Sequence, residues 1–200
     1  DVRREALVQL RSVIVTAPDQ LRQELRGLSQ TRLIERCNRL RRSSSRSPDE
    51  LAATLVLRTL ARRVQSAPGE AAELQTEILA HVRTVAPRLL EERGVGPIVA
   101  AQLIVSWSHK GRVRSEAAFA RLAGVAPIPA SSGQTIRQRL SRGGDRQLNR
   151  ALHTVILHRR LHDPETRRYI ERRVAEGKTR RDATRLLKRY LARHLYRVLN

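Results

Sequence analysis

The sequence has very little of what several protein classes need. Cys37 is the only cysteine among 200 residues, so no disulfide can form within the chain. The longest apolar run, 97–107, is too short to span a membrane and contains Gln102. No secretory signal-peptide pattern opens the chain. We therefore expect a protein of a reducing, cytoplasmic compartment without membrane segments.

Aromatic residues and methionine are also scarce. Aromatic residues make up 2% of the chain and are scattered, which argues against the stacking platforms of single-strand binders. Leu, Ala, Val and Ile supply nearly all the apolar side chains, and together with abundant Arg and Glu they favour a helical protein. Methionine is absent even at position 1, so we expect the chain to be a piece of a longer protein.

Acidic residues are scarcest in the second half of the chain. Residues 1–109 hold 17 Lys and Arg against 12 Asp and Glu, whereas residues 110–200 hold 23 against 7, a balance of +16. Arg outnumbers Lys 37 to 3, and coding bias can explain that choice but not the missing acids. A charge of this size calls for a polyanion, and we expect nucleic acid as the partner.

Helical periodicity runs through the first 90 residues. Apolar side chains recur at helical spacing in three stretches, 1–14, 21–33 and 51–90. Ser47 and Glu50 match a capping box before the third stretch. Proline and glycine at 66–70 predict a break or a kink there. Two long antiparallel helices and a coiled-coil arm that pairs with a second subunit both fit this pattern.

A Gly-Val-Gly-Pro turn at 94–97 precedes a new helix of small residues. In a helix-hairpin-helix such glycines let the backbone approach a phosphate, which the next helix binds through its first N–H groups. Gly94 and Gly96 are therefore candidate DNA-binding residues, although a plain turn between helices has the same preferences. The expected fold is all-α: a helical connector or dimerisation arm, coiled-coil-like, over 1–88, then a helical domain over 89–200 with the helix-hairpin-helix.

A serine turn followed by arginines lies between residues 131 and 150. Prolines keep 125–129 extended, and Ser131-Ser132-Gly133 predicts a tight turn with hydroxyls near the surface. Five arginines follow it: Arg137, Arg139, Arg142, Arg146 and Arg150. A serine needs help to attack a phosphate, and guanidinium groups can stabilise the charge that develops. Ser132 is thus a candidate nucleophile, while a turn without a catalytic role is the alternative.

Other chemistries find less support in this half of the sequence. His153 and His158 fall on different helical faces, and no Cys or His spacing predicts a metal site. The seven acids, mostly at expected helix caps or on exposed faces, do not predict the carboxylate cluster of a two-metal nuclease. The sequence 143–145 lacks the Lys-Ser/Thr of a Walker loop. We expect neither a metal nor a cofactor in this chain itself.

Four motifs in order, at 94–97, 119–127, 131–133 and 141–152, resemble one protein family. They are similar to the C-terminal transposase domain of insertion-sequence family one hundred and ten, the bridge-RNA-guided DNA recombinases. Residues 1–90 resemble the helical connector of the same proteins. The resemblance implies a serine recombinase in which Ser132, rather than Ser131, attacks a DNA phosphodiester and forms a covalent phosphoserine intermediate. The arginines it implies for the phosphates are Arg137, Arg139 and Arg142, with Arg146 and Arg150 extending that surface.

The resemblance also implies partners and a further domain. The family carries an N-terminal RuvC-like domain whose acidic residues bind Mg²⁺, and nothing in this sequence matches it. We therefore expect this chain alone to bind DNA or RNA without exchanging strands. The implied partners are double-stranded DNA, a guide RNA and further copies of the chain in a dimer or tetramer. Arg142 and Asp145 stand where the family often has Lys and Asn. The alternative function is a non-catalytic helix-hairpin-helix DNA- or RNA-binding module.

Overall fold

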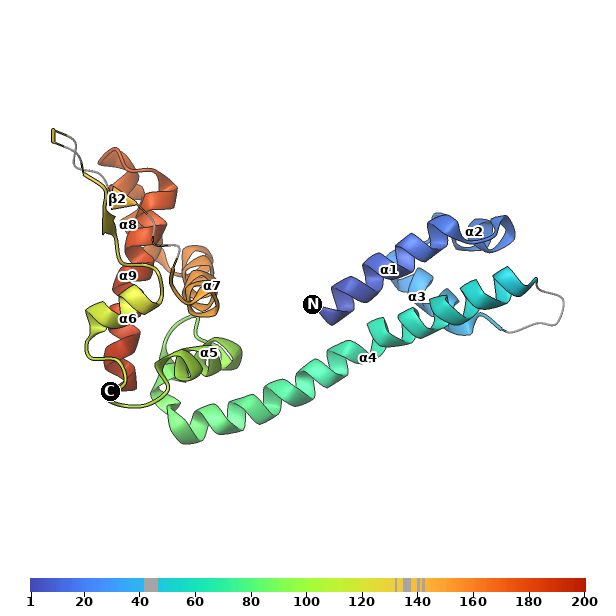
Figure 1. Ribbon diagram of the computed structural model, residues 1–200, viewed down its shortest axis with the longest axis horizontal. Helices are drawn as coiled ribbons and strands as arrows, with labels where there is room; N and C mark the ends of the chain where they lie inside the picture. The colour runs from blue at the N-terminus through green and yellow to red at the C-terminus, as the bar shows by residue number, and fades with distance from the viewer. Residues whose placement is uncertain (42–46, 132, 135–137, 140, 142) are drawn as a thin grey trace. The chain divides into compact units, whose positions relative to one another are not determined.

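The computed structural model describes residues 1–41, 47–131, 133–134, 138–139, 141 and 143–200 (Figure 1). The described elements are mostly helices, which confirms the predicted all-α class. Contacts divide the chain into unit 1, Asp1–Leu74, and unit 2, Gln75–Asn200. The predicted division into a 1–88 arm and an 89–200 domain stays a prediction. In the described part of the chain, no helix is long and apolar enough to cross a membrane.

Unit 1 packs helices around an aliphatic core. Its elements are α1 (Val2–Thr16), α2 (Asp19–Leu25), α3 (Gln30–Arg39) and the first part of α4 (Pro48–Val85). Leu10 and Leu57 are fully enclosed in this core. Cys37 is buried there too, and burial, followed by the charge of Glu24, raises the pKa of its thiol to about 11. The thiol is therefore protonated and unreactive at neutral pH.

The long helix α4 begins with the predicted capping box. The Ser47 amide donates to the Glu50 carboxylate at 3.1 Å, and the Glu50 amide donates to Ser47 Oγ at 3.3 Å. The helix then continues through Pro68, so of the break or kink predicted at 66–70 the break is wrong, and so is the pair of antiparallel helices. Proline removes one backbone donor, whereas the Ala, Glu, Leu and Gln residues that follow favour helix. Pairing of this arm with a second subunit stays a prediction.

Unit 2 holds the remaining helices. They are the end of α4, the 3₁₀ helix η1 (Pro87–Glu91), α5 (Pro97–Trp107), α6 (Glu116–Leu122), α7 (Arg146–His162), α8 (Pro164–Ala175) and α9 (Arg180–Leu199). α5 packs against α7, and α9 packs against α6, α7 and α8. Phe119, Leu103 and Leu152 are fully buried in the core that these helices share. α9 therefore joins elements that are far apart in the sequence.

The first helix of the predicted helix-hairpin-helix differs from expectation. The sequence predicted an α-helix as far as Leu90, but α4 ends at Val85 and η1 follows. The reason is Pro87, which has no backbone donor and disfavours helical backbone at the residue before it. The Gly-Val-Gly-Pro turn then leads into α5, whose N-cap is Gly96.

One pair of very short strands was not expected from the sequence. β1 (Ile128–Pro129) pairs antiparallel with β2 (Gln138–Arg139), and Ile128 stands opposite Arg139. β1 lies in the stretch that the prolines were predicted to keep extended. Because the strands pair, Pro129 and Gln138, which lie on either side of the Ser-Ser-Gly sequence, stand opposite each other.

Candidate functional site

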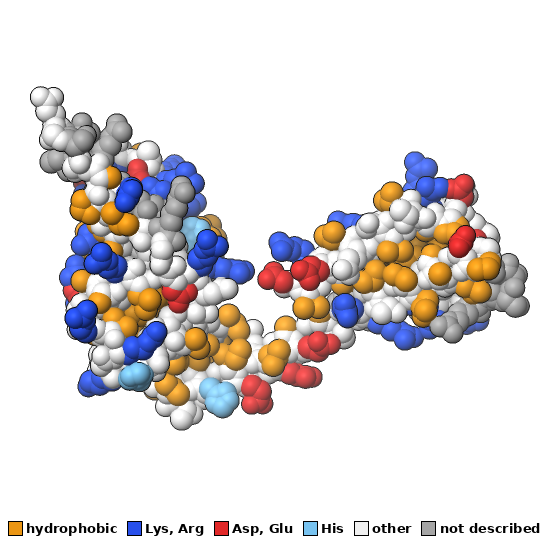
Figure 2. Space-filling view, viewed as in Figure 1, with side chains coloured by type: hydrophobic (Ala, Val, Ile, Leu, Met, Phe, Trp, Pro, Cys, Tyr) orange, Lys and Arg blue, Asp and Glu red, His pale blue; other side chains and the backbone are white. Residues whose placement is uncertain are grey.

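A basic hollow of about 590 Å³ opens on unit 2 between α7, α9 and the loop before α7. No Asp or Glu is among its described lining residues, which include six cations: Arg146, Arg160, Arg180, Arg181, Arg185 and Lys188. The rest of the lining is Ala123, Gly124, Ser141, Gly144, Asn149, His153 and Thr184. Figure 2 shows Lys and Arg side chains gathered on this unit over α7 and α8.

Most cations of the basic hollow lack an acidic partner. Of the six, Arg185 is ion-paired, with Asp182 at 2.9 Å, and the other five make no ion pair with any residue that the structure describes. By contrast, Arg159 pairs with Glu92 at 3.2 Å elsewhere in unit 2. Cations that repel one another without counter-charges produce a strong positive potential, and this potential favours an anion in the hollow.

Lys188 is a half-buried cation of the basic hollow. Its ammonium donates to Asn149 Oδ1 at 2.7 Å, and Asn149 Nδ2 donates to the Ala123 carbonyl at 2.7 Å. Burial, followed by the charge of Arg185, lowers the pKa of Lys188. Burial and then the charge of Lys188 also lower the pKa of His153, which is therefore neutral at pH 7. A bound anion would supply the counter-charge that Lys188 lacks.

A close contact between two glycines fixes the loop before α7. A Cβ atom on Gly144 would lie 2.4 Å from the amide nitrogen of Gly124 and 2.8 Å from the Leu122 carbonyl oxygen. The Asp145 amide donates to that same carbonyl at 2.7 Å. The loop therefore rests directly on the end of α6, and a side chain at position 144 would prevent this contact. Ser141, in the same loop, reaches the basic hollow.

Asp145 ties this loop to α5 and α7. Its Oδ1 accepts from the Gln147 and Leu148 amides at 2.8 and 3.0 Å, which caps α7. Its Oδ2 accepts from the hydroxyl of buried Ser106 at 2.6 Å. Burial opposes ionisation, but the hydrogen bonds from Ser106 and the two amides outweigh it and lower the pKa of Asp145. Asp145, where the sequence departs from the family it resembles, thus has a structural role.

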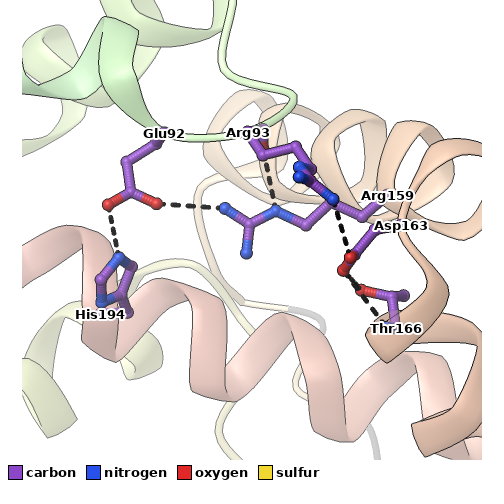
Figure 3. Close-up of polar contacts among 6 residues, drawn as sticks. All are labelled: Glu92, Arg93, Arg159, Asp163, Thr166 and His194. Atoms are coloured by element: carbon purple, nitrogen blue, oxygen red, sulfur yellow. Dashed lines mark hydrogen bonds and ion pairs between the residues drawn. The ribbon is translucent and has the colours of Figure 1, made fainter.

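A second network anchors the Gly-Val-Gly-Pro turn to three helices (Figure 3). Glu92 accepts from Arg159 Nη2 at 3.2 Å, and its other oxygen lies 2.6 Å from His194 Nε2. Arg159 Nε also donates to the Arg93 carbonyl at 2.8 Å, and Arg93 pairs with Asp163 at 2.9 Å. Because these partners belong to α7, α9 and the start of α8, the turn is held in a fixed position on the helical core.

The two glycines predicted to bind DNA have different surroundings. Gly94 has a φ of +82°, in the left-handed region that favours glycine. A Cβ atom there would lie 3.1 Å from His158 and 3.4 Å from Val155, so Gly94 packs against α7. Gly96 is exposed, with no atom within 4 Å of an added Cβ. Neither glycine lines the basic hollow.

The predicted catalytic serine and arginines are only partly described. Ser132, Arg137 and Arg142 lie outside the described residues. Arg146 lines the basic hollow, and Arg150 is exposed one turn further along α7. The remaining one, Arg139 in β2, lines a neighbouring hollow that shares Gly124, Arg185 and Lys188 with the basic hollow.

Sequence reasoning missed the cations that α9 and the end of α7 contribute. Arg160, Arg180, Arg181, Arg185 and Lys188 were not predicted site residues, and they supply most of the positive charge of the basic hollow. The run Lys178-Thr179-Arg180-Arg181 was a signal in the sequence, because its three cations have only Asp182 beside them. No feature of the nearby sequence, however, indicated that this run lies beside a loop some forty residues earlier.

The residues around the basic hollow do not fit a magnesium ion, which prefers carboxylate oxygens. Among the described residues, no three His, Cys, Asp or Glu side chains form a group that could hold a metal ion. Two acids beside the hollow have other partners, since Asp145 caps α7 and Asp182 pairs with Arg185.

Comparison with known proteins identifies part of unit 2. Residues 86–171, from just before η1 into α8, match the model of the Transposase IS116/IS110/IS902 family. This segment is therefore similar to the transposase domain of that family. A relative in Streptomyces coelicolor (strain ATCC BAA-471 / A3(2) / M145), the insertion element IS110 uncharacterized 43.6 kDa protein, is 35% identical over 130 residues. The match covers 64% of this chain and 32% of the relative, so it spans about a third of that protein. The matched segment contributes Arg146 and Arg160 to the basic hollow, and α9, beyond the matched residues, contributes the other cations.

Three capping aspartates should make the stability of unit 2 sensitive to acid. Hydrogen bonds from Thr166 and Thr179, respectively, are the main cause of the lowered pKa of Asp163 and Asp182, and the pKa of Asp145 is lowered too. A carboxyl whose pKa falls on folding adds stability above the unfolded value of about 3.9 and loses it as the pH drops through the folded value.

We expect the free energy of unfolding, measured by urea titration with circular dichroism, to stay level from pH 7 to about 5 and to fall below about 4. The Asp145→Asn variant should show a smaller fall over the same range, because it has one such carboxyl fewer. A loss of stability confined to the range between pH 7 and 5 would contradict this prediction.

Proposed function

We propose that this chain is the DNA-binding and strand-cleaving part of a transposase that moves an insertion sequence. The observation that carries the proposal is the basic hollow, where six cations lie in and beside the segment that matches the transposase family, with no carboxylate among the described lining residues. Phosphate contacts by Arg and Lys supply most of the affinity of proteins for DNA, and they need no particular base sequence. The arrangement therefore suits double-stranded DNA held by its backbone.

We further propose that Ser132 is the nucleophile of the reaction. In this step the serine Oγ loses its proton and forms a bond to phosphorus, while the bond to one deoxyribose oxygen breaks and that oxygen leaves as a hydroxyl. Guanidinium groups stabilise the extra negative charge on the attacked phosphate. The residues on either side of the serine turn support this proposal. β1 and β2, which flank it, pair with each other, and Ser141, which follows β2, lines the basic hollow.

Replacing Ser132 by alanine should abolish covalent attachment to DNA without weakening binding. The test incubates the complete gene product and its guide RNA with end-labelled duplex DNA from the insertion site, then separates adducts on a denaturing gel. Wild type and the matched control Ser131→Ala should give a labelled adduct, and Ser132→Ala none, with duplex affinities equal within about twofold. An adduct that persists in Ser132→Ala would remove this residue from the role.

The rival function is a binding module without catalysis. The exposed Gly96 at the start of α5 favours it, because this position is open to a phosphate. The rival predicts salt-sensitive binding, no adduct in any variant, and indifference to changes at Ser132. The same gel therefore separates the two functions.

A guide RNA is the second nucleic-acid partner that we propose. Its phosphates carry the same charge as those of DNA, so the basic hollow alone does not distinguish the two. Competition between labelled duplex DNA and a structured RNA from the same insertion element tests this partner. If the RNA is bound elsewhere on the protein, both should bind together rather than displace each other.

A further inference from the structure

A second hollow of about 440 Å³ adjoins the basic hollow on unit 2. It lies between α8, the start of α9 and the end of α7, and we call it the adjoining hollow. Arg160, Arg180 and Thr184 line both hollows, so the two are continuous. The remaining lining residues are Arg167, Ile170, Glu171, Val174 and Ala175.

The two hollows differ in the chemistry of their surfaces. The basic hollow has six cations, whereas the adjoining hollow has an aliphatic patch made of Ile170, Val174 and Ala175. The adjoining hollow also has a carboxylate, Glu171, which forms no ion pair with any described residue. Three arginines, Arg160, Arg167 and Arg180, line the adjoining hollow as well. Beside them, the aliphatic patch and the carboxylate make it less favourable to a second phosphate than the basic hollow, because the phosphate would lose water against the aliphatic groups and be repelled by Glu171.

The same surface suits a flat heterocycle with N–H donors. Aliphatic side chains can cover one face of a base, and the guanidinium planes of Arg160 and Arg167 can stack on it. A carboxylate accepts hydrogen bonds from the exocyclic amino group of cytosine. Glu171 would accept this bond, while the carbonyl oxygen at the same place on thymine or uracil would be repelled.

We propose that the adjoining hollow binds one unpaired nucleobase, with a preference for cytosine over thymine or uracil, while its phosphate lies in the basic hollow. The proposal rests on the proposed function, because it takes the basic hollow as the phosphate site. The shared cations Arg160 and Arg180 place the two groups of one nucleotide side by side. A base inside a duplex is stacked and paired, so the ligand is a nucleotide of a DNA or RNA strand at a bulge, gap or end.

The test measures the affinity of the chain for four DNA duplexes that differ at one position. One carries a single cytosine bulge, the second a thymine bulge, the third an abasic bulge, and the fourth is fully paired. Wild type should bind the cytosine bulge about tenfold more tightly than the abasic bulge. Both bulges bend the duplex, so the difference in affinity measures the contribution of the base. A thymine bulge should lie between them, and Glu171→Gln should reduce the gap between cytosine and thymine.

Val174→Arg is the decisive variant, because Val174 is 39% exposed and tolerates a polar side chain without loss of core packing. The new arginine fills the adjoining hollow and adds a positive charge. It should abolish the preference for the cytosine bulge while leaving affinity for the paired duplex equal or higher. The matched control is Val105→Arg on α5, where the valine is 71% exposed and lies in neither hollow; this variant should keep the preference.

The outcomes separate this proposal from the function on which it rests. Equal affinity of wild type for cytosine and abasic bulges would overturn the base site, even if salt-dependent duplex binding remained. Loss of all salt-dependent binding would instead contradict the phosphate role of the basic hollow. The same comparison with an RNA hairpin that carries a single bulged cytosine identifies the source of the nucleotide: tighter binding of the RNA bulge indicates an RNA strand, and tighter binding of the DNA bulge a DNA strand.

Discussion

Gly144→Ala is expected to destabilise unit 2 by about 3 kcal/mol, because its new methyl group would overlap backbone atoms at the end of α6. The Cβ atom would lie 2.4 and 2.5 Å from the nitrogen and Cα of Gly124, and 2.8 Å from the Leu122 carbonyl oxygen. Backbone cannot rotate away as a flexible side chain can. The loop would have to leave the end of α6, which also breaks the hydrogen bond from the Asp145 amide to Leu122.

The neighbouring glycine provides the matched control. A Cβ atom on Gly143 meets nothing within 4 Å, so Gly143→Ala should change the free energy of unfolding by no more than about 0.5 kcal/mol. Urea denaturation of both variants, followed by circular dichroism, gives the comparison. The contact between Gly144 and Gly124 is wrong if Gly144→Ala is as stable as Gly143→Ala. DNA affinity should fall with Gly144→Ala alone, because Ser141 and Arg146 on either side of the loop line the basic hollow.

Removing two unpaired arginines from the basic hollow should cause the largest loss of DNA affinity. The double variant Arg146→Ala, Arg181→Ala takes one cation from the start of α7 and one from the start of α9. Each lost phosphate contact should reduce the slope of log affinity against log salt by about 1, so we expect a slope smaller by about 2. At about 0.1 M salt, affinity should fall by about tenfold or more, measured by fluorescence anisotropy with labelled duplex.

Net charge alone would also weaken binding, so the control must lose the same charge elsewhere. The variant Arg3→Ala, Arg62→Ala removes two exposed arginines from unit 1. It should keep the salt slope of wild type and lose at most about twofold in affinity. Equal effects from the two double variants would mean that DNA responds to the overall charge of the protein and has no particular site in the basic hollow.

Much of the helical architecture could be predicted because its signals are local. Ser115, Asp163 and Thr179 each accept a backbone hydrogen bond at the start of a helix, and all three are residue types that favour this position. The exception was Pro68, where a residue that usually breaks helices is accommodated within α4. Helix formation there depends on the sum over many good helix formers, which outweighs one missing hydrogen bond.

The candidate site could be predicted only in part, because its residues meet through tertiary packing. The charge excess after residue 110 indicated a polyanion partner, and Arg146 was a predicted site residue that lines the basic hollow. The role of α9 depends on how that helix packs, and the hydrogen bond from Ser106 to Asp145 joins residues 39 positions apart. Neither has a local pattern. The role of the acid at position 145 depends on tertiary packing too, since its partner Ser106 lies in another helix.

Chemical footprinting of arginine tests most directly whether nucleic-acid phosphates lie in the basic hollow. The chain is treated with phenylglyoxal, which modifies accessible guanidinium groups, with and without a saturating duplex, and each site is quantified by mass spectrometry. Bound DNA should protect Arg146, Arg160, Arg180 and Arg181 strongly, while Arg3 and Arg62 on unit 1 stay reactive. Unchanged reactivity of the four hollow arginines while the duplex is bound would contradict the assignment.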